Sequence, residues 1–155
     1  MESVTINWEK GVIEYSTVEA SGAKKLGYIG FYAILGGIYN QSKKMYLNIT
    51  LLYIGQAYEQ SLKKRIPQPH PSINKWLKNH SEYTPLVMIG HRKVVGKISQ
   101  ALYDDIECCL IYDNQPLCND KCKERYSSTG REITITNDGD YTPLKRVSVC
   151  KCCRE

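Results

Sequence analysis

The fold is decided by residues 27–56, GYIGFYAILGGIYNQSKKMYLNITLLYIGQ, a stretch rich in Tyr, Ile and Leu. Its middle, residues 40–44, is polar and contains residue types that favour turns. Two apolar arms on either side of a polar turn are typical of a β-hairpin. We therefore predict one long hairpin over this stretch.

The position of the turn selects which tyrosines share a face of the hairpin. Side chains alternate between the two faces of a strand, and opposed residues lie at equal distances from the turn. Tyr32 and Tyr53 are centred between residues 42 and 43, inside the polar segment. Tyr39 and Tyr53 would instead be centred on residue 46, in an apolar run. For a hairpin without a bulge we predict Tyr32 directly opposite Tyr53, with residues 37–39 in a distal extension.

A short helix follows the hairpin. Tyr58, Leu62 and Ile66 recur every four residues, which places them on one face of a helix. Pro67 ends the helix because proline cannot continue the hydrogen-bond pattern. Arg65 lies at the edge of the buried stripe, from where it could project toward the hairpin.

The rest of the chain alternates between helical and strand patterns. Ser72 resembles the N-cap of a second helix. Residues 85–95 are typical of a strand, residues 95–112 of a longer helix, and residues 131–137 of a final strand. Glu107 lies at the margin of the buried face of the longer helix, so its carboxylate can point into a cleft.

Length and composition indicate one compact domain. The 155 residues divide into an N-terminal extension (1–26), a central domain (27–120) and a C-terminal extension with a Cys-rich tail (121–155). No apolar run reaches the roughly 20 residues that span a bilayer, and the N-terminus does not resemble a signal peptide. We expect a cytoplasmic protein with no membrane contact.

The charge of the chain permits, without requiring, contact with a phosphate backbone. Net charge is +5, and basic residues gather at 63–65, 75–78 and 91–93. A solvated surface is the plainer interpretation of each cluster.

The seven cysteines are predicted to be thiols and not disulfides, because the lack of a secretion signal indicates a reducing compartment. Cys108 and Cys109 fall in an apolar helical pattern and are predicted to be small core residues. The alternative to free thiols in the tail is a structural Zn²⁺ site with four thiolate ligands, namely Cys118, Cys122, Cys150 and Cys153.

Several of these features together resemble the GIY-YIG nuclease superfamily. They are the strand Gly30-Phe31-Tyr32-Ala33-Ile34, the strand Tyr53-Ile54-Gly55, and then Arg65, Glu107 and Asn119 in the expected order. The resemblance covers residues 27–120. It implies an α/β (α+β) fold with a small three-stranded antiparallel sheet that contains the long β-hairpin and is flanked by helices.

The resemblance also implies a divalent-metal-dependent endonuclease that hydrolyses phosphodiester bonds in DNA. Glu107 would hold one Mg²⁺ or Mn²⁺ ion, and Arg65 would clamp the scissile phosphate. Tyr32 would help to activate the attacking water, and Tyr53 would orient water or phosphate. Asn119 would hold Glu107 and the strands in place.

Members of this family often carry a histidine or a tyrosine about one helical turn after the arginine. His70 is the nearest match here, with His80 and His91 as competitors. Gln56 stands where many relatives have a lysine.

Two other functions are compatible with the sequence. One is a catalytically silent domain of the same fold that only binds nucleic acid. The other is a zinc-stapled interaction module built on the Cys-rich tail. The sequence does not distinguish DNA from RNA as the substrate, or a specific sequence from a branched or damaged structure. It also does not distinguish a monomer from a homodimer.

Overall fold

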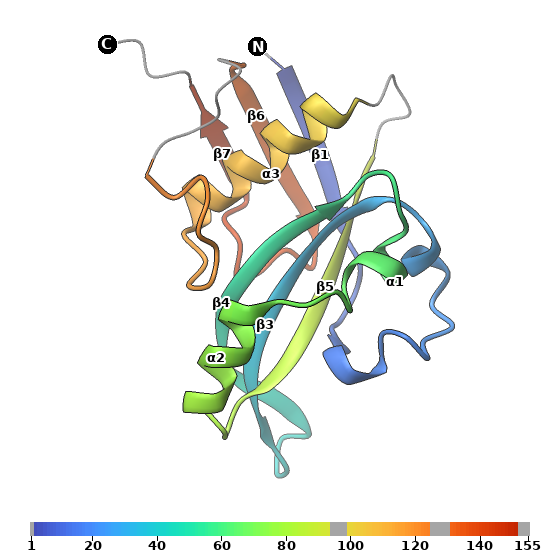
Figure 1. The fold of residues 1–155 in the computed structure, drawn as a ribbon, viewed down its shortest axis with the longest axis vertical. Helices are drawn as coiled ribbons and strands as arrows, with labels where there is room; N and C mark the ends of the chain where they lie inside the picture. The colour runs from blue at the N-terminus through green and yellow to red at the C-terminus, as the bar shows by residue number, and fades with distance from the viewer. Residues whose placement is uncertain (1, 94–98, 125–130, 152–155) are drawn as a thin grey trace.

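The computed structural model describes residues 2–93, 99–124 and 131–151, and its main element is one curved, seven-stranded mixed sheet (Figure 1). The strand order is β4-β3-β5-β1-β6-β7, and β2 pairs with β5 outside this path. All pairs are antiparallel except β1 with β6. The strands are β1 (Glu2–Trp8), β2 (Ile13–Glu14), β3 (Gly30–Asn40), β4 (Met45–Ala57), β5 (Thr84–Arg92), β6 (Ile133–Gly139) and β7 (Val147–Cys150).

The predicted fold class, a small three-stranded antiparallel sheet flanked by helices, is wrong. Strands β4, β3 and β5 are antiparallel, but β1, β6 and β7 continue the same sheet. The parallel pairing of β1 with β6 joins segments from the two predicted extensions, residues 1–26 and 121–155. Alternation within each segment indicates a strand without revealing its partner, so the sequence pattern missed this part of the sheet.

The turn of the predicted hairpin is confirmed. Strands β3 and β4 are joined at residues 41–44. Residues 37–39 lie in the distal part of the hairpin, where Tyr39 pairs with Tyr46.

The predicted register of the two tyrosines is wrong by two residues. Tyr32 pairs with Gly55, and Tyr53 pairs with Ile34. The strands carry irregularities between Ile34 and Leu35 and farther along the hairpin, and such bulges shift the pairing. Tyr32 and Tyr53 are consequently diagonal neighbours on one face, within reach of each other.

Three α-helices accompany the sheet in the described residues: α1 (Leu62–Arg65), α2 (Pro71–Asn79) and α3 (Gln100–Asn114). The cap of α2 is His70, with Pro71 in the first turn, so the predicted Ser72 cap is wrong. Helix α3 is capped by Ser99, whose side chain accepts a hydrogen bond from the Leu102 amide; residues 95–98 of the predicted helix lie outside the described residues.

The core lies on both faces of the sheet. Phe31, Ala33 and Leu35 of β3 pack with α3, whereas the alternate residues Tyr32 and Ile34 pack with α1 and α2. Two short 3₁₀ turns, η1 (Tyr15–Thr17) and η2 (Lys24–Gly27), border the second cluster. Polar groups placed at the edge of this layer can therefore be held rigidly.

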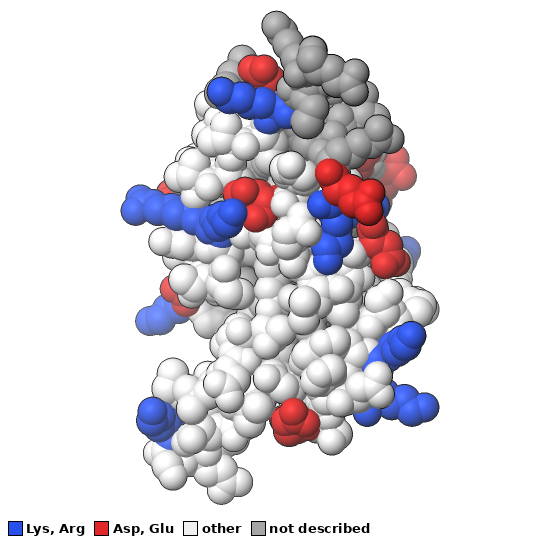
Figure 2. Space-filling view, turned by 90° about the vertical axis from the view of Figure 1, so that its left-hand side faces the viewer, with Lys and Arg blue, Asp and Glu red and all other residues white. Residues whose placement is uncertain are grey.

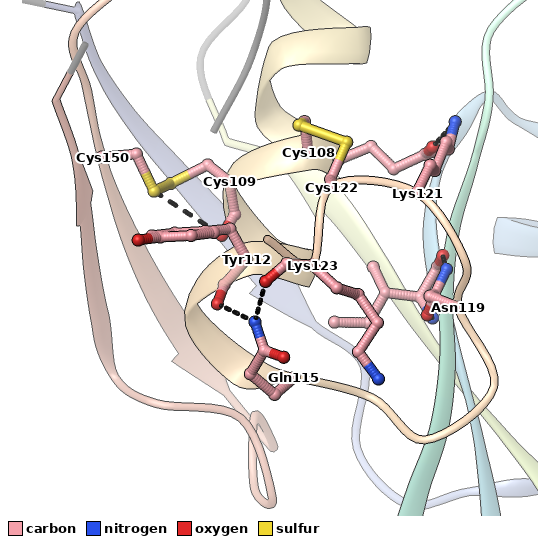
Figure 3. The surroundings of a disulfide bond; sticks show 11 residues. Cys108, Cys109, Tyr112, Gln115, Asn119, Lys121, Cys122, Lys123 and Cys150 are labelled. Atoms are coloured by element: carbon pink, nitrogen blue, oxygen red, sulfur yellow. Dashed lines mark hydrogen bonds and ion pairs between the residues drawn. A yellow bond between two sulfur atoms is a disulfide. The ribbon is translucent and has the colours of Figure 1, made fainter. Parts of the chain in front are cut away.

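Four cysteines form disulfide bonds, contrary to the predicted thiols. Cys108 bonds to Cys122, and Cys109 bonds to Cys150 (Figure 3). The predicted Zn²⁺ site is therefore wrong, because Cys122 and Cys150 each have a sulfur partner and Cys153 lies outside the described residues. Disulfides persist mainly in oxidising surroundings, so the thiol argument for a reducing compartment does not hold.

No helix in the described part of the chain is long and apolar enough to cross a membrane.

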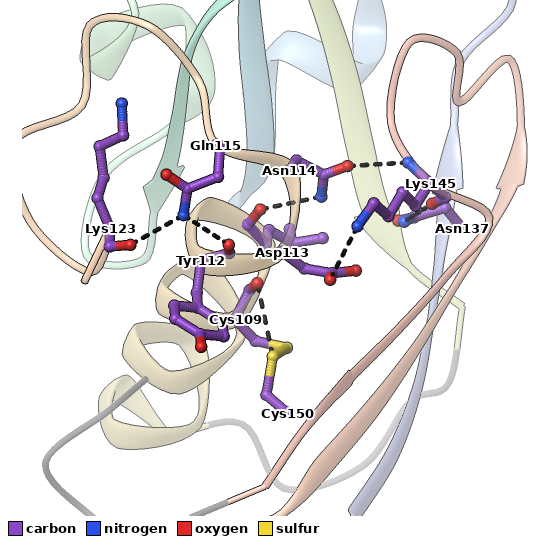
Figure 4. A network of polar contacts seen from close by, with 10 residues as sticks. Cys109, Tyr112, Asp113, Asn114, Gln115, Lys123, Asn137, Lys145 and Cys150 are labelled. Carbon is purple, nitrogen blue, oxygen red and sulfur yellow. Dashed lines mark hydrogen bonds and ion pairs between the residues drawn. A yellow bond between two sulfur atoms is a disulfide. The ribbon is translucent and has the colours of Figure 1, made fainter. Parts of the chain in front are cut away.

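A polar network fastens the end of α3 to the β6–β7 connection (Figure 4). The amide N–H of Lys145 donates to the Asn114 side chain (2.8 Å), and the Lys145 ammonium pairs with Asp113 (3.2 Å). Asn137, which is fully buried, donates to the Lys145 carbonyl (2.8 Å) and accepts from the Trp8 indole (2.9 Å). One side chain thus links β1, β6 and the segment that holds α3.

Replacement of Asn137 by Ala should lower the free energy of unfolding by about 1–3 kcal/mol, because the Trp8 indole loses its buried acceptor. Urea unfolding measures the change. Thr136→Ala, on the half-buried opposite face of β6, is the matched control and should cost much less. Equal losses in the two variants would contradict this account of β6.

Candidate functional site

A cavity of about 340 Å³ lies beside strand β4. Its wall combines Tyr53 of β4, Arg65 of α1, residues 69–73 around the start of α2, and residues 118–121 of the loop after α3. Four of the six predicted site residues, Tyr53, Arg65, His70 and Asn119, therefore line one cavity.

The Tyr32 ring contacts the rings of two of these residues. Its ring centroid lies 6.1 Å from that of Tyr53 and 6.2 Å from that of His70. The Tyr53 and His70 rings are 4.9 Å apart. The Arg65 guanidinium carbon lies 5.9 Å from the Tyr32 ring centroid, which is within cation–π range. Three rings and one cation from four elements thus pack as a unit.

The position of the Tyr32 ring explains why residue 55 is a glycine. A Cβ atom at residue 55 would lie less than 3.0 Å from three atoms of the Tyr32 side chain. Tyr32 is fully buried and cannot swing aside. The glycine of Tyr53-Ile54-Gly55 therefore leaves room for the tyrosine that the hairpin places over it.

The Tyr32 hydroxyl is buried and has no hydrogen-bond partner among the residues that the structure describes. Burial raises the pKa of this phenol well above its usual value, although the nearby Arg65 charge acts in the opposite direction. The hydroxyl consequently stays protonated at neutral pH. This disfavours the predicted part of Tyr32 in activating water and favours a packing role.

His70 is held as a neutral imidazole. Its Nε2 lies 3.0 Å from the Ile66 carbonyl oxygen, which can only accept, so Nε2 carries the proton and Nδ1 is the basic nitrogen. Burial lowers the pKa of His70 and the Arg65 charge lowers it further, while the hydrogen bond to Ile66 acts in the opposite direction.

The competing histidines lie elsewhere. His80 stacks on Trp76 with ring centroids 3.9 Å apart. His91 contacts the Lys25 carbonyl (3.0 Å). Neither lines the cavity.

Asn119 fastens one wall of the cavity to the sheet. Its side chain accepts from the Ile54 amide (2.9 Å) and donates to the Ile54 carbonyl (3.0 Å). The amides of Leu117 and Cys118 donate to Leu51 and Leu52 of the same strand. Because β4 ends the sheet on this side, the loop satisfies an otherwise open strand edge.

Glu107 reaches the site through Lys121. Its carboxylate is buried and ion-paired with the Lys121 ammonium, which lines the cavity. Burial raises the pKa of Glu107, and Lys121 partly offsets this. Burial acts to lower the pKa of Lys121, but the charge and hydrogen bond of Glu107 outweigh it and raise that pKa. Lys121 carried no signal in the sequence, where it is one lysine in a polar segment.

The predicted Mg²⁺ or Mn²⁺ site at Glu107 is wrong. An ammonium group already neutralises the carboxylate. The described residues contain no group of three or more His, Cys, Asp or Glu side chains arranged to hold an ion. Hard cations prefer several oxygen ligands, which this carboxylate does not have around it.

The cavity wall offers donor groups that an anion can bind. Arg65 and Lys121 each bring a positive charge to it, but Asp120 adds a carboxylate and Lys121 is already paired with the buried Glu107. The first turn of α2 also lines it, contains no acidic residue and has no side-chain cap. Amide N–H groups in the first turn of a helix lack intrahelical acceptors and attract anions.

The face drawn in Figure 2 carries no large basic patch, because its Lys and Arg side chains are dispersed among Asp and Glu. In one of the predicted basic clusters, Lys93 is paired with Asp138 (2.9 Å). The positive charge at the cavity is therefore local.

No protein-family model, curated protein or solved structure matches this chain. The family resemblance accordingly remains a prediction, and the chemistry of the site has to be argued from its own residues.

Replacement of Gly55 by Ala should destabilise the protein by about 1–3 kcal/mol, because a new methyl group would overlap a ring that cannot move. Gly22→Ala is the control, since a Cβ there meets nothing within 4 Å. Chemical denaturation of both variants provides the measurement. Similar stabilities would show that the Tyr32 ring does not lie over residue 55.

Proposed function

We propose that this protein is an endonuclease that hydrolyses phosphodiester bonds in DNA, with an active site built from residues that resemble those of the GIY-YIG family. The observation that carries the proposal is that Tyr53, Arg65, His70 and Asn119 line one cavity, with the Arg65 guanidinium in its wall. Tyr32 and Glu107 adjoin it through Tyr53 and Lys121.

The phosphate would be bound from two sides. Arg65 has a planar fork of donors that matches two phosphate oxygens. Lys121 of the loop after α3 adds a point charge, and the amides at the start of α2 supply further donors. A negatively charged phosphodiester could contact all three groups.

His70 is the best-placed group to accept a proton. As water attacks the phosphorus, its proton would pass to Nδ1 of the neutral imidazole. The P–O3′ bond would then break, and the departing oxygen would take a proton from solvent. Arg65 and Lys121 would offset the charge that develops on the phosphate. Tyr53 would orient the water or the phosphate.

Glu107 has a different task in this proposal from the one expected of a metal ligand. Its buried carboxylate would hold the Lys121 ammonium at the cavity. It is therefore a positioning residue, and its loss would act through Lys121.

Replacement of Arg65 by Ala should slow nicking of a supercoiled plasmid by roughly 100- to 1000-fold, because one fixed cation at the reacting phosphate is lost. Lys63→Ala is the control: it removes an equal charge from an exposed position of the same helix. The rate should stay close to that of the unsubstituted protein. The assays are run both with Mg²⁺ and with EDTA.

Two results would contradict hydrolysis. One is DNA binding without nicking in either buffer, which would support the catalytically silent nucleic-acid-binding domain. The other is an equal effect of Arg65→Ala and Lys63→Ala.

The nicking rate should fall as pH drops through the lowered pKa of His70, below its usual 6.5. The neutral imidazole accepts the proton, so activity is present above this pKa and lost below it. Rates measured from acid to neutral pH test this. His70→Gln should be slow and should lack this acid limb; an unchanged limb in that variant would assign it to another group.

A further inference from the structure

The loop that carries Lys121 is fixed on both sides of this residue. On one side, Asn119 makes two hydrogen bonds with the backbone of Ile54 on β4. On the other side, Cys122 is covalently bonded to Cys108 on α3. Lys121 thus lies in a short span between a strand and a helix.

The residues of the ion pair are the sequence neighbours of the residues of the disulfide, on α3 and on the loop alike. Glu107 immediately precedes Cys108, and Lys121 immediately precedes Cys122. The Cα atoms of the two cysteines are 5.3 Å apart. Figure 3 shows the Lys121 side chain beside this bond. The disulfide therefore holds together the two backbones whose side chains form the ion pair.

The backbone at Cys122 has an uncommon conformation. Its φ is +62°, in the left-handed region that residues with a side chain seldom adopt. The other described contacts of this segment hold Lys123: its ammonium donates to the Pro116 carbonyl (2.6 Å), and its carbonyl accepts from the Gln115 side chain (2.9 Å). Both partners lie at the start of the same loop, and neither contact ties residue 121 to Glu107.

We propose that the Cys108–Cys122 disulfide is a redox-sensitive positioning element that keeps Lys121 at the cavity as a phosphate-binding residue. A dithiol reductant would break the S–S bond with two electrons and two protons, giving two cysteine thiols while the dithiol closes to its own disulfide. The loop would then relax, Lys121 would leave Glu107, and the affinity for phosphate would fall. The binding part of this inference rests on the proposed function, whereas the positioning of Lys121 does not.

The second disulfide provides an internal control. Cys109 is the next residue on α3, and adjacent residues of an α-helix point about 100° apart. Its partner, Cys150, belongs to β7, on the other side of the helix from the cavity loop. Loss of the Cys109–Cys150 bond should leave the pair between Lys121 and Glu107 intact.

The first experiment measures the reactivity of the Lys121 amine toward an acylating reagent, by mass spectrometry, with Lys78 on α2 as the reference. In the double variant C108S/C122S, labelling of Lys121 should rise roughly two- to five-fold, because an amine released from a carboxylate loses its proton more readily. In C109S/C150S it should not change. Equal labelling in both variants would overturn the positioning role.

Lys121 labelling with and without the Cys108–Cys122 bond can also be compared in a protein that keeps both of these cysteines. C109S/C150S retains only the bond between Cys108 and Cys122 among the two disulfides described, so dithiothreitol added to that folded variant should reproduce the rise in labelling. No rise on reduction would likewise overturn the proposal, even if C108S/C122S fails to fold.

The second experiment measures affinity for a fluorescent DNA duplex at low salt. C108S/C122S and Lys121→Ala should each weaken binding roughly two- to five-fold, and combining them should add nothing, because both act on one contact. Additive losses would show that the disulfide acts independently of Lys121. If the unsubstituted protein does not bind DNA, the proposed function fails, and the labelling result alone decides whether the disulfide positions Lys121.

Discussion

The arrangement of the site depends on one requirement, the pairing of the outer edge of β4. A strand at the end of a sheet presents backbone N–H and C=O groups that need partners. The loop after α3 supplies them through Leu117, Cys118 and Asn119. Because these contacts fix the loop in register with β4, they also fix the wall of the cavity that faces Arg65 and His70.

Burial then sets the chemistry of the groups that meet there. Burial lowers the pKa of His70 and raises the pKa of Tyr32, so the imidazole is neutral and the phenol protonated at neutral pH. Arg65 and Lys121 lie at the margin, where water reaches them. The site therefore combines fixed cations with a proton acceptor that is uncharged at neutral pH.

Features of the fold that depend only on residues close together in the sequence could be predicted. The turn at residues 41–44, strand β5 and most of α3 follow from local polarity and periodicity. The meeting of Tyr53, Arg65, His70 and Asn119 at one cavity could be anticipated only through the family resemblance. The register of Tyr32 and Tyr53 could not, because a bulge leaves no consistent mark in residue types. Disulfide partners and the pairing of β1 with β6 depend on contacts across the fold, as does the meeting of Lys121 with Glu107.

The place of β1 in the sheet has a consequence for how the chain folds. This strand is the earliest described element, yet it lies between β5 and β6, and β6 is formed by residues near the other end of the chain. During synthesis, β1 can pair with β5 only after that strand has emerged, and its second edge stays open until residue 139 has been made. Contacts of such long sequence separation slow folding. The central sheet therefore closes only after residue 139 has been made, as a property of strand order and independently of any side chain in the cavity.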